Sequence, residues 1–185
     1  VTQEGENVTV CAVKGNFDDC QSGVKKIFTD HKVLEALEQG GMTFSSANSI
    51  NWGRLVPQIV YYVSSYVSLA ESGHLLNVVV PTGNFGNILA AYYAKMMGVP
   101  LGKLICASNI NKVLTDFIRT GVYNRNRQFY PTASPSMDIL ISSNLERLLY
   151  LLTGEDDAQI REWFTALAEQ GTYEVTDAVK AKLTE

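Results

Sequence analysis

The stretch from Leu76 to Met97 constrains the fold of this chain more than any other part of the sequence. Leu76 to Pro81 contains three consecutive valines, and a run of β-branched residues predicts a buried strand. Two glycines follow in the loop Gly83-Asn84-Phe85-Gly86-Asn87. The next segment is rich in Ala, Leu, Lys and Met and predicts a helix from Asn87 to Met97. A strand, a glycine loop and a helix in this order are typical of α/β proteins.

The loop is suited to an anion. Glycines allow a sharp turn and the close approach of backbone N–H groups to a ligand. The first amides of a helix have no acceptor within the helix, and the helix dipole is positive at this end. We therefore expect Gly83 to Asn87 to bind a phosphate group. The alternative is a glycine turn that only packs the strand against the helix.

Nucleotide signatures are missing from the loop. It lacks Gly-Lys-Ser/Thr, so it is not the phosphate loop of a nucleoside triphosphatase. It also lacks the third glycine of the dinucleotide pattern GxGxxG. A second Gly-Asn-Phe, at Gly15 to Phe17, serves as an internal control. Asp18 and Asp19 follow this copy and would repel a phosphate. The copy at Gly83 to Phe85 is followed by the uncharged Gly86 and Asn87.

The remaining pattern alternates between strands and helices. We predict strands over Asn7–Val13, Met42–Ser46, Leu76–Pro81 and Lys103–Ser108. Further helices are expected over residues 18–28, 30–39, 52–72, 112–119 and 156–170, and after Val175. This order predicts an α/β protein with a three-layer, doubly wound, mostly parallel sheet of about four strands flanked by helices. We expect one cofactor-binding domain over 1–185, with residues 142–185 as its helical carboxyl-terminal extension.

Polar side chains follow the second predicted strand. Asn48, Ser49 and Asn51 are either ligand-facing hydrogen-bonding groups or caps of the next helix. Arg54 would lie in the first turn of that helix, where a cation is unfavourable unless an anion is near. These four residues are the candidates for a substrate pocket. Ser143 and Glu146 have the spacing of a capping box.

Composition excludes several classes of function. The net charge of −4 and the absence of a Lys/Arg cluster argue against nucleic-acid binding. No apolar run is long enough to cross a membrane, and the two histidines do not form a metal-ligand pattern. Three scattered cysteines indicate reduced thiols and a cytoplasmic protein. The chain starts with Val1 rather than Met, which leaves open that it is a fragment.

Four blocks of the sequence resemble threonine synthase. They are Gly15-Asn16-Phe17-Asp18-Asp19-Cys20-Gln21, Asn48-Ser49-Ile50-Asn51-Trp52, Pro81 to Asn87, and Ser134 to Ile139 together with Ser142 to Leu149. The blocks follow the order of that family and span nearly the whole chain. The resemblance implies a pyridoxal-phosphate enzyme of the tryptophan-synthase-β type, which converts O-phospho-L-homoserine and water to L-threonine and phosphate. It also implies that Gly83, Asn84, Phe85, Gly86 and Asn87 hold the cofactor phosphate.

The sequence departs from the family at the catalytic lysine. The family's Schiff-base lysine lies in an Ala/Ser-Phe-Lys-Asp block, and none of the lysines here does: Lys14, Lys25, Lys26, Lys32, Lys95, Lys103, Lys112, Lys180 and Lys182. We therefore expect a central fragment that is inactive alone and has no catalytic residue of its own. Two alternatives stay open: another pyridoxal-phosphate lyase of the same fold, such as a threonine dehydratase or cysteine synthase, or a non-catalytic anion-binding or interaction domain.

Overall fold

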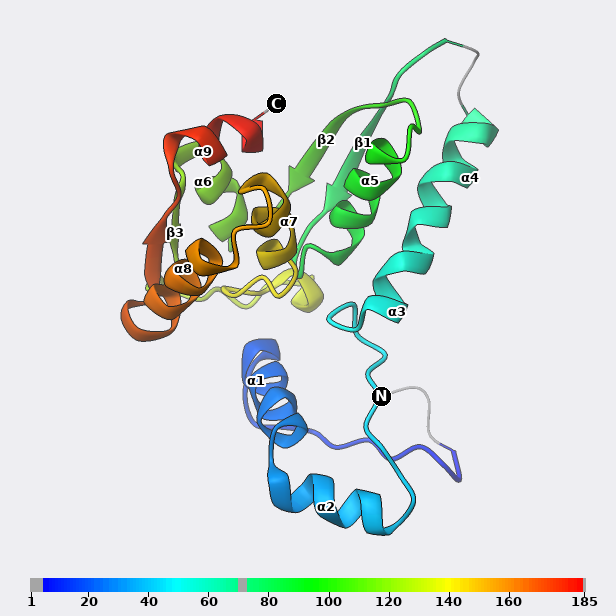
Figure 1. The fold of residues 1–185 in the computed structure, drawn as a ribbon, viewed down its shortest axis with the longest axis vertical. Coiled ribbons are helices and arrows are strands. Elements are labelled where there is room, and N and C mark those ends of the chain that lie inside the picture. The colour runs from blue at the N-terminus through cyan, green and yellow to red at the C-terminus, as the bar shows by residue number, and fades with distance from the viewer. Residues whose placement is uncertain (1–4, 70–72, 185) are drawn as a thin grey trace. The chain divides into compact units, whose positions relative to one another are not determined.

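A computed structural model describes residues 5–69 and 73–184 of the chain (Figure 1). These residues fall into two compact units, Val1–Phe44 and Ser45–Glu185. In the first unit, α1 (Phe17–Phe28) and α2 (His31–Gln39) agree with the predicted helices. The rings of Phe28 and Phe44 stack with their centroids 4.7 Å apart.

The second unit is built around β1 (Leu76–Pro81), α5 (Gly86–Met96) and β2 (Leu101–Ala107). The two strands are parallel, and Val79 pairs with Ile105 while Val80 pairs with Cys106. Before β1 come α3 (Trp52–Leu55), a 3-10 turn η1 (Val56–Gln58) and α4 (Ile59–Leu69). Pro57 lies in the 3-10 turn and interrupts the single long helix that the sequence predicts, because proline cannot donate a helical hydrogen bond.

The chain after β2 is mostly helical. It contains α6 (Val113–Thr120), β3 (Val122–Asn124), a 3-10 turn η2 (Pro135–Met137), α7 (Leu145–Leu152), α8 (Asp157–Gln170), β4 (Thr172–Glu174) and α9 (Asp177–Thr184). Strands β3 and β4 pair antiparallel, with Tyr123 opposite Tyr173. Their rings stack 5.3 Å apart beside Phe117, in the main hydrophobic core.

The α/β class is confirmed, but the expected number of strands in the sheet is wrong. Among the described residues, the parallel sheet has two strands, and residues 7–13 and 42–46 form no strand apart from one isolated bridge between Gly5 and Val8. The expected three layers are also incomplete within these residues. Val79 and Ile105, on the face of the sheet opposite Val80, are 61% and 44% exposed. The domain boundaries, including the 142–185 extension, stay predictions.

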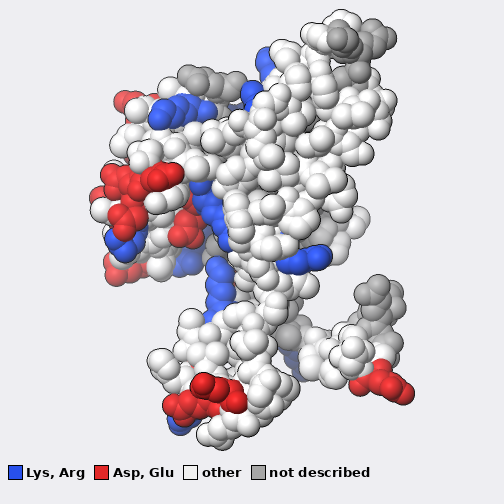
Figure 2. All heavy atoms as spheres, turned by 45° about the vertical axis from the view of Figure 1, so that its right-hand side comes forward, with Lys and Arg blue, Asp and Glu red and all other residues white. Residues whose placement is uncertain are grey.

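Helix α4 carries no charged residue, and Val60, Tyr61, Val67 and Leu69 on it are all more than 60% exposed. Figure 2 shows a broad surface without Lys, Arg, Asp or Glu in this part of the second unit. In the part of the chain that the structure describes, no helix is long and apolar enough to cross a membrane.

Candidate functional site

The glycine loop connects β1 to α5. Strand β1 ends at Pro81, and the N–H of Thr82 donates the last hydrogen bond to the carbonyl of Ala107, at 2.8 Å. The loop then turns at Phe85, which has a left-handed backbone with φ of 64°. Its side chain is only 5% exposed, so the ring is anchored in the core. A left-handed conformation is unfavourable for a phenylalanine, and such strain is concentrated at functional sites.

Six consecutive amides in this loop are available to a ligand. Within the described residues, the backbone N–H groups of Gly83 to Ile88 donate no hydrogen bond, and no side chain caps the start of α5. The second Gly-Asn-Phe differs, as the sequence predicts. There Asn16 and Asp19 form a reciprocal capping box at the start of α1, with hydrogen bonds of 2.8 and 3.1 Å. The start of α1 is thus closed by its own side chains, and the start of α5 is open.

The two glycines of the loop do not make its sharp turn, and their expected role in the close approach of a ligand stays a prediction. Neither Gly83 nor Gly86 has a positive φ, because Phe85 makes the left-handed turn. They are required by close packing. A Cβ on Gly86 would lie 2.5 Å from Oγ of Ser49, and a Cβ on Gly83 would lie 3.1 Å from the carbonyl oxygen of Ser136.

The loop lines a hollow of about 210 Å³. The walls come from Val80 to Ile88 and from Ser49, Gln58, Ser136 and Met137. One buried atom in this wall, Oδ1 of Asn84, has no hydrogen-bond partner in the described part of the chain. A buried polar atom without a partner is costly, so it is a natural contact for a ligand. No lysine lines the hollow among the described residues.

Asn87 is held by Tyr62 of α4. The Tyr62 hydroxyl donates to both the backbone carbonyl and Oδ1 of Asn87. Burial raises the pKa of Tyr62 to about 12, so it stays a neutral donor at physiological pH. Asn87 belongs to the predicted phosphate loop, and its backbone N–H remains available while its side chain is tied to α4.

The four candidates for a substrate pocket have different surroundings. Asn51 caps α3, where its Oδ1 accepts from the N–H of Gly53 and its Nδ2 donates to the carbonyl of Ser46. Asn48 accepts from the N–H of Ile50 in a local turn, and Nε of Arg54 donates to the carbonyl of Ala47. Of the four, Ser49 lines the hollow. The cap alternative holds for Asn51, and the substrate role of all four stays a prediction.

Three residues before and within α7 contact the site, and the sequence pattern did not assign them a role. Oγ of Ser142 donates to the carbonyl of Gly83 at 2.9 Å. Nδ2 of Asn144 donates to the carbonyl of Asn84 at 2.9 Å and to Oγ of Ser49 at 3.0 Å. Arg147 donates to Oδ1 of Asn144 and to the carbonyls of Ser49 and Ile50. The capping box predicted for Ser143 and Glu146 is wrong, because α7 starts after Asn144 without a side-chain cap.

Asp138 forms a separate buried cluster. Its carboxylate accepts hydrogen bonds from the N–H and hydroxyl of Thr132 and from the side chains of Asn109 and Asn111, at 2.7 to 3.1 Å. Burial raises its pKa, but these hydrogen bonds stabilise the charged form and hold the pKa below its usual value. The residue braces the segment that leads into Ser136 and Met137, two walls of the hollow. In the described residues, no group of three or more His, Cys, Asp and Glu is placed to hold a metal ion.

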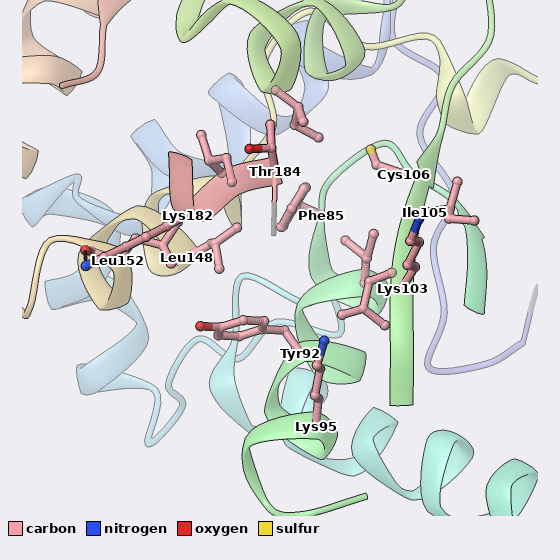
Figure 3. Close-up of a pocket in the computed structure, with 14 residues that line it drawn as sticks. Phe85, Tyr92, Lys95, Lys103, Ile105, Cys106, Leu148, Leu152, Lys182 and Thr184 are labelled. Carbon is pink, nitrogen blue, oxygen red and sulfur yellow. Dashed lines mark hydrogen bonds between the residues drawn. The ribbon is translucent and has the colours of Figure 1, made fainter. Parts of the chain in front are cut away.

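A larger pocket of about 410 Å³ lies behind the loop (Figure 3). It is lined mainly by apolar residues of α5, β2, α7 and α9, and Phe85 and Ile88 line both this pocket and the hollow. Two of its lysines are engaged: Nζ of Lys95 donates to the carbonyl of Gly102, and Nζ of Lys182 donates to that of Leu152.

No family model matches the chain. It is 48% identical to human threonine synthase-like 1 over 190 residues, which covers 99% of this chain and 26% of that protein. It is 41% identical to threonine synthase of Eremothecium gossypii, covering 95% of this chain and 35% of that protein. The crystal structure of PLP-bound threonine synthase from Brucella melitensis superposes with a TM-score of 0.80 and 42% identity, covering 93% of this chain and 36% of that one.

The chain belongs to the threonine synthase family. The resemblance carried by the four sequence blocks is therefore confirmed. The chain spans about a quarter of the length of threonine synthase-like 1 and about a third of the length of the fungal threonine synthase. The structural match to a threonine synthase also confirms the α/β class.

Proposed function

We propose that this chain is part of a pyridoxal-phosphate-dependent threonine synthase, a carbon–oxygen lyase that acts on phosphates. Its substrate is O-phospho-L-homoserine, which reacts with water to give L-threonine and phosphate. The proposal rests on the six consecutive backbone N–H groups from Gly83 to Ile88, at the uncapped start of α5, that donate no hydrogen bond within the described residues. In this proposal Gly83, Asn84, Phe85, Gly86 and Asn87 bind the cofactor phosphate.

The residues present fit a phosphate group. Backbone N–H groups at a helix start bind phosphate through hydrogen bonds and the positive end of the helix dipole. The carboxamide of Asn84 adds donors through its NH₂ group, and its buried oxygen can accept from a ligand hydroxyl. Arg147, which pairs with no Asp or Glu of the described residues, adds a positive charge beside the Ser49 wall.

The chain supplies binding and orientation to the proposed reaction. Pyridoxal phosphate, when bound, supplies an electron sink for the proton removal and phosphate elimination. The described lining of the hollow holds no lysine, so we place the Schiff-base lysine in a part of the natural-length protein outside this lining. Asn48, Ser49, Asn51 and Arg54 remain the proposed substrate side. A cytoplasmic location is supported by the three free cysteines.

The substitution Asn84→Asp in the natural-length protein tests the phosphate site. It keeps the size of the side chain but adds a negative charge at the hollow. Like charges about 4 Å apart repel by about 4 kcal/mol near a protein surface, so we expect at least about tenfold weaker binding of pyridoxal phosphate. Binding of pyridoxal, which lacks the phosphate, should change far less. Gln128→Glu is the matched control, since it makes the same amide-to-acid change at an exposed residue outside the hollow.

Equal affinities of the natural-length protein for pyridoxal phosphate and pyridoxal would refute the phosphate assignment. So would an Asn84→Asp variant that keeps the original preference. A substitution at Gly86 is a poorer test, because a side chain there also collides with Ser49. Release of phosphate from O-phospho-L-homoserine, with formation of threonine, tests the reaction. Turnover of threonine or of a cysteine precursor instead would favour another lyase of the same fold.

A further inference from the structure

The carbonyl groups of the glycine loop are held from behind by the segment that enters α7. The carbonyl of Gly83 accepts from Oγ of Ser142, at 2.9 Å. The carbonyl of Asn84 accepts twice from Asn144, from its backbone N–H at 3.0 Å and from Nδ2 at 2.9 Å. These contacts join residues 59 and 60 positions apart in the sequence. They occupy the carbonyl oxygens of Gly83 and Asn84 and leave the backbone N–H groups of the loop free to bind a ligand.

The direction of each carbonyl also determines the direction of an amide. A trans peptide is planar, so the C=O of one residue and the N–H of the next point to opposite sides. No described peptide bond is cis. When Ser142 and Asn144 hold the carbonyls of Gly83 and Asn84, the N–H groups of Asn84 and Phe85 must point the other way. Both of those residues line the hollow.

Asn144 is itself rigidly placed. Its side chain is fully buried, and it does not cap its own helix. Its Oδ1 accepts from Nη1 of Arg147 at 2.5 Å, and its Nδ2 also reaches Oγ of Ser49 at 3.0 Å. The Arg147 guanidinium in turn lies over the Trp52 ring, 5.8 Å from its centroid. The donors of Asn144 are therefore aimed at the loop by contacts on its other side.

Ser142 is held in a similar way. Its N–H donates to the hydroxyl of Tyr123 at 3.0 Å, and that hydroxyl donates to the carbonyl of Leu140 at 3.0 Å. Tyr123 is 1% exposed in the core. The segment from Leu140 to Asn144 thus forms a fixed wall against which the loop peptides are oriented.

We propose that Asn144, assisted by Ser142, is a positioning residue that turns the loop amides toward the cofactor phosphate. This inference rests on the phosphate site proposed above and names residues that act on it without touching the ligand. Asn144 acts through the carbonyl of Asn84, and Ser142 acts through the carbonyl of Gly83. Loss of the Ser142 hydroxyl frees the carbonyl of Gly83, and loss of the Asn144 side chain leaves the carbonyl of Asn84 with only the backbone N–H of Asn144. Either loss lets a peptide plane rotate more freely and weakens the contact of the loop amides with the phosphate.

The test compares pyridoxal phosphate with pyridoxal in the natural-length protein. We expect Asn144→Ala to weaken pyridoxal phosphate binding about tenfold, which corresponds to one hydrogen bond lost at the phosphate. Its affinity for pyridoxal should change less than about twofold. Leu167→Ala is the control, because it opens a cavity in the same hydrophobic core but lies in α8, outside both the hollow and the pocket that Phe85 lines. It should alter both affinities in the same proportion, as a merely structural effect would.

Ser142→Ala supplies an independent variant, since it removes a single donor and decides the matter if Asn144→Ala does not fold. An unchanged ratio of the two affinities in the variants that fold overturns the positioning role. The phosphate site itself survives that result if Asn84→Asp still abolishes the preference for pyridoxal phosphate. If the natural-length protein shows no such preference, the phosphate site fails first and the positioning role fails with it.

Discussion

The close contact between Gly86 and Ser49 predicts that Gly86→Ala destabilises α5, and that the same substitution no longer does so once Ser49 is replaced by glycine. A Cβ on Gly86 would lie 2.5 Å from Oγ and 2.7 Å from Cβ of Ser49. Carbon atoms pack at about 3.5 to 4.0 Å, so Ser49 would have to retreat by about 1 Å. Asn144 and Arg147 hydrogen-bond to Ser49 and resist this shift. We therefore expect Gly86→Ala to destabilise α5 by about 1 to 3 kcal/mol, the usual cost of overpacking.

The same substitution should be favourable once Ser49 is reduced to glycine. Gly86 lies at the first position of α5 without a positive φ, and alanine is favoured over glycine in a helix by up to about 1 kcal/mol. In the Ser49→Gly background we expect Gly86→Ala to stabilise α5 or leave it unchanged. The coupling energy between the two sites is then about 1 to 4 kcal/mol, which exceeds the error of additivity of about 0.3 to 0.5 kcal/mol.

Hydrogen exchange of the α5 amides measures this coupling, because it reports the free energy of opening of one helix in the natural-length protein. The four proteins of the cycle are the natural form, the two single variants and the double variant. An equal cost of Gly86→Ala in both backgrounds would show that Ser49 is not the obstacle. The glycine at position 86 would then need a reason other than this contact.

Two further predictions concern stability. The pKa of Asp138 is lowered on folding, so its contribution to the free energy of unfolding is present above the unfolded pKa of about 3.9 and is lost as the pH falls through the folded value. We expect Asp138→Asn to lower the melting temperature at pH 7 and to flatten the decline of the melting temperature below about pH 4. Parallel curves of melting temperature against pH for the two proteins would contradict this. Gly171→Ala should lower the free energy of unfolding by about 1 to 2 kcal/mol because of its φ of 79°, and further because the new Cβ displaces Asn126. Gly154 has a φ of 76° with open space around it, so Gly154→Ala should show the backbone cost alone in thermal denaturation. Equal losses of stability in the two variants would exclude a role for Asn126.

Local signals in the sequence were sufficient for the centre of the fold. Strand β1, the loop and α5 lie within about one residue of their predicted bounds, because β-branched residues, Pro81 and a run of helix formers act within a short window. The strands predicted over 7–13 and 42–46 have no such support. Val8, Val10 and Val13 are 43% to 57% exposed, and a strand requires a pairing partner that no local pattern reveals.

In the candidate site, too, local sequence patterns predicted the features that arise within a few residues and missed the contacts between distant segments. The open helix start at Gly83 to Asn87 and the closed one at Asn16 to Asp19 differ as the residue types predict. Asn144 was not found, since its position before a helix indicates a cap and its contact with Asn84 spans 60 residues. Strands β3 and β4 were missed because three residues each are too few to show a period.

The left-handed backbone of Phe85 has a consequence for how the loop meets a ligand. Holding a phenylalanine at φ of 64° costs about 1 to 2 kcal/mol, and burial of the ring offsets this with about 2 to 3 kcal/mol. The turn is thus completed during folding, before any anion arrives. The loop is preorganised: ligand binding does not have to supply the energy of bending it, and changes in the core beneath the Phe85 ring will be felt as changes in the affinity of the amides above it.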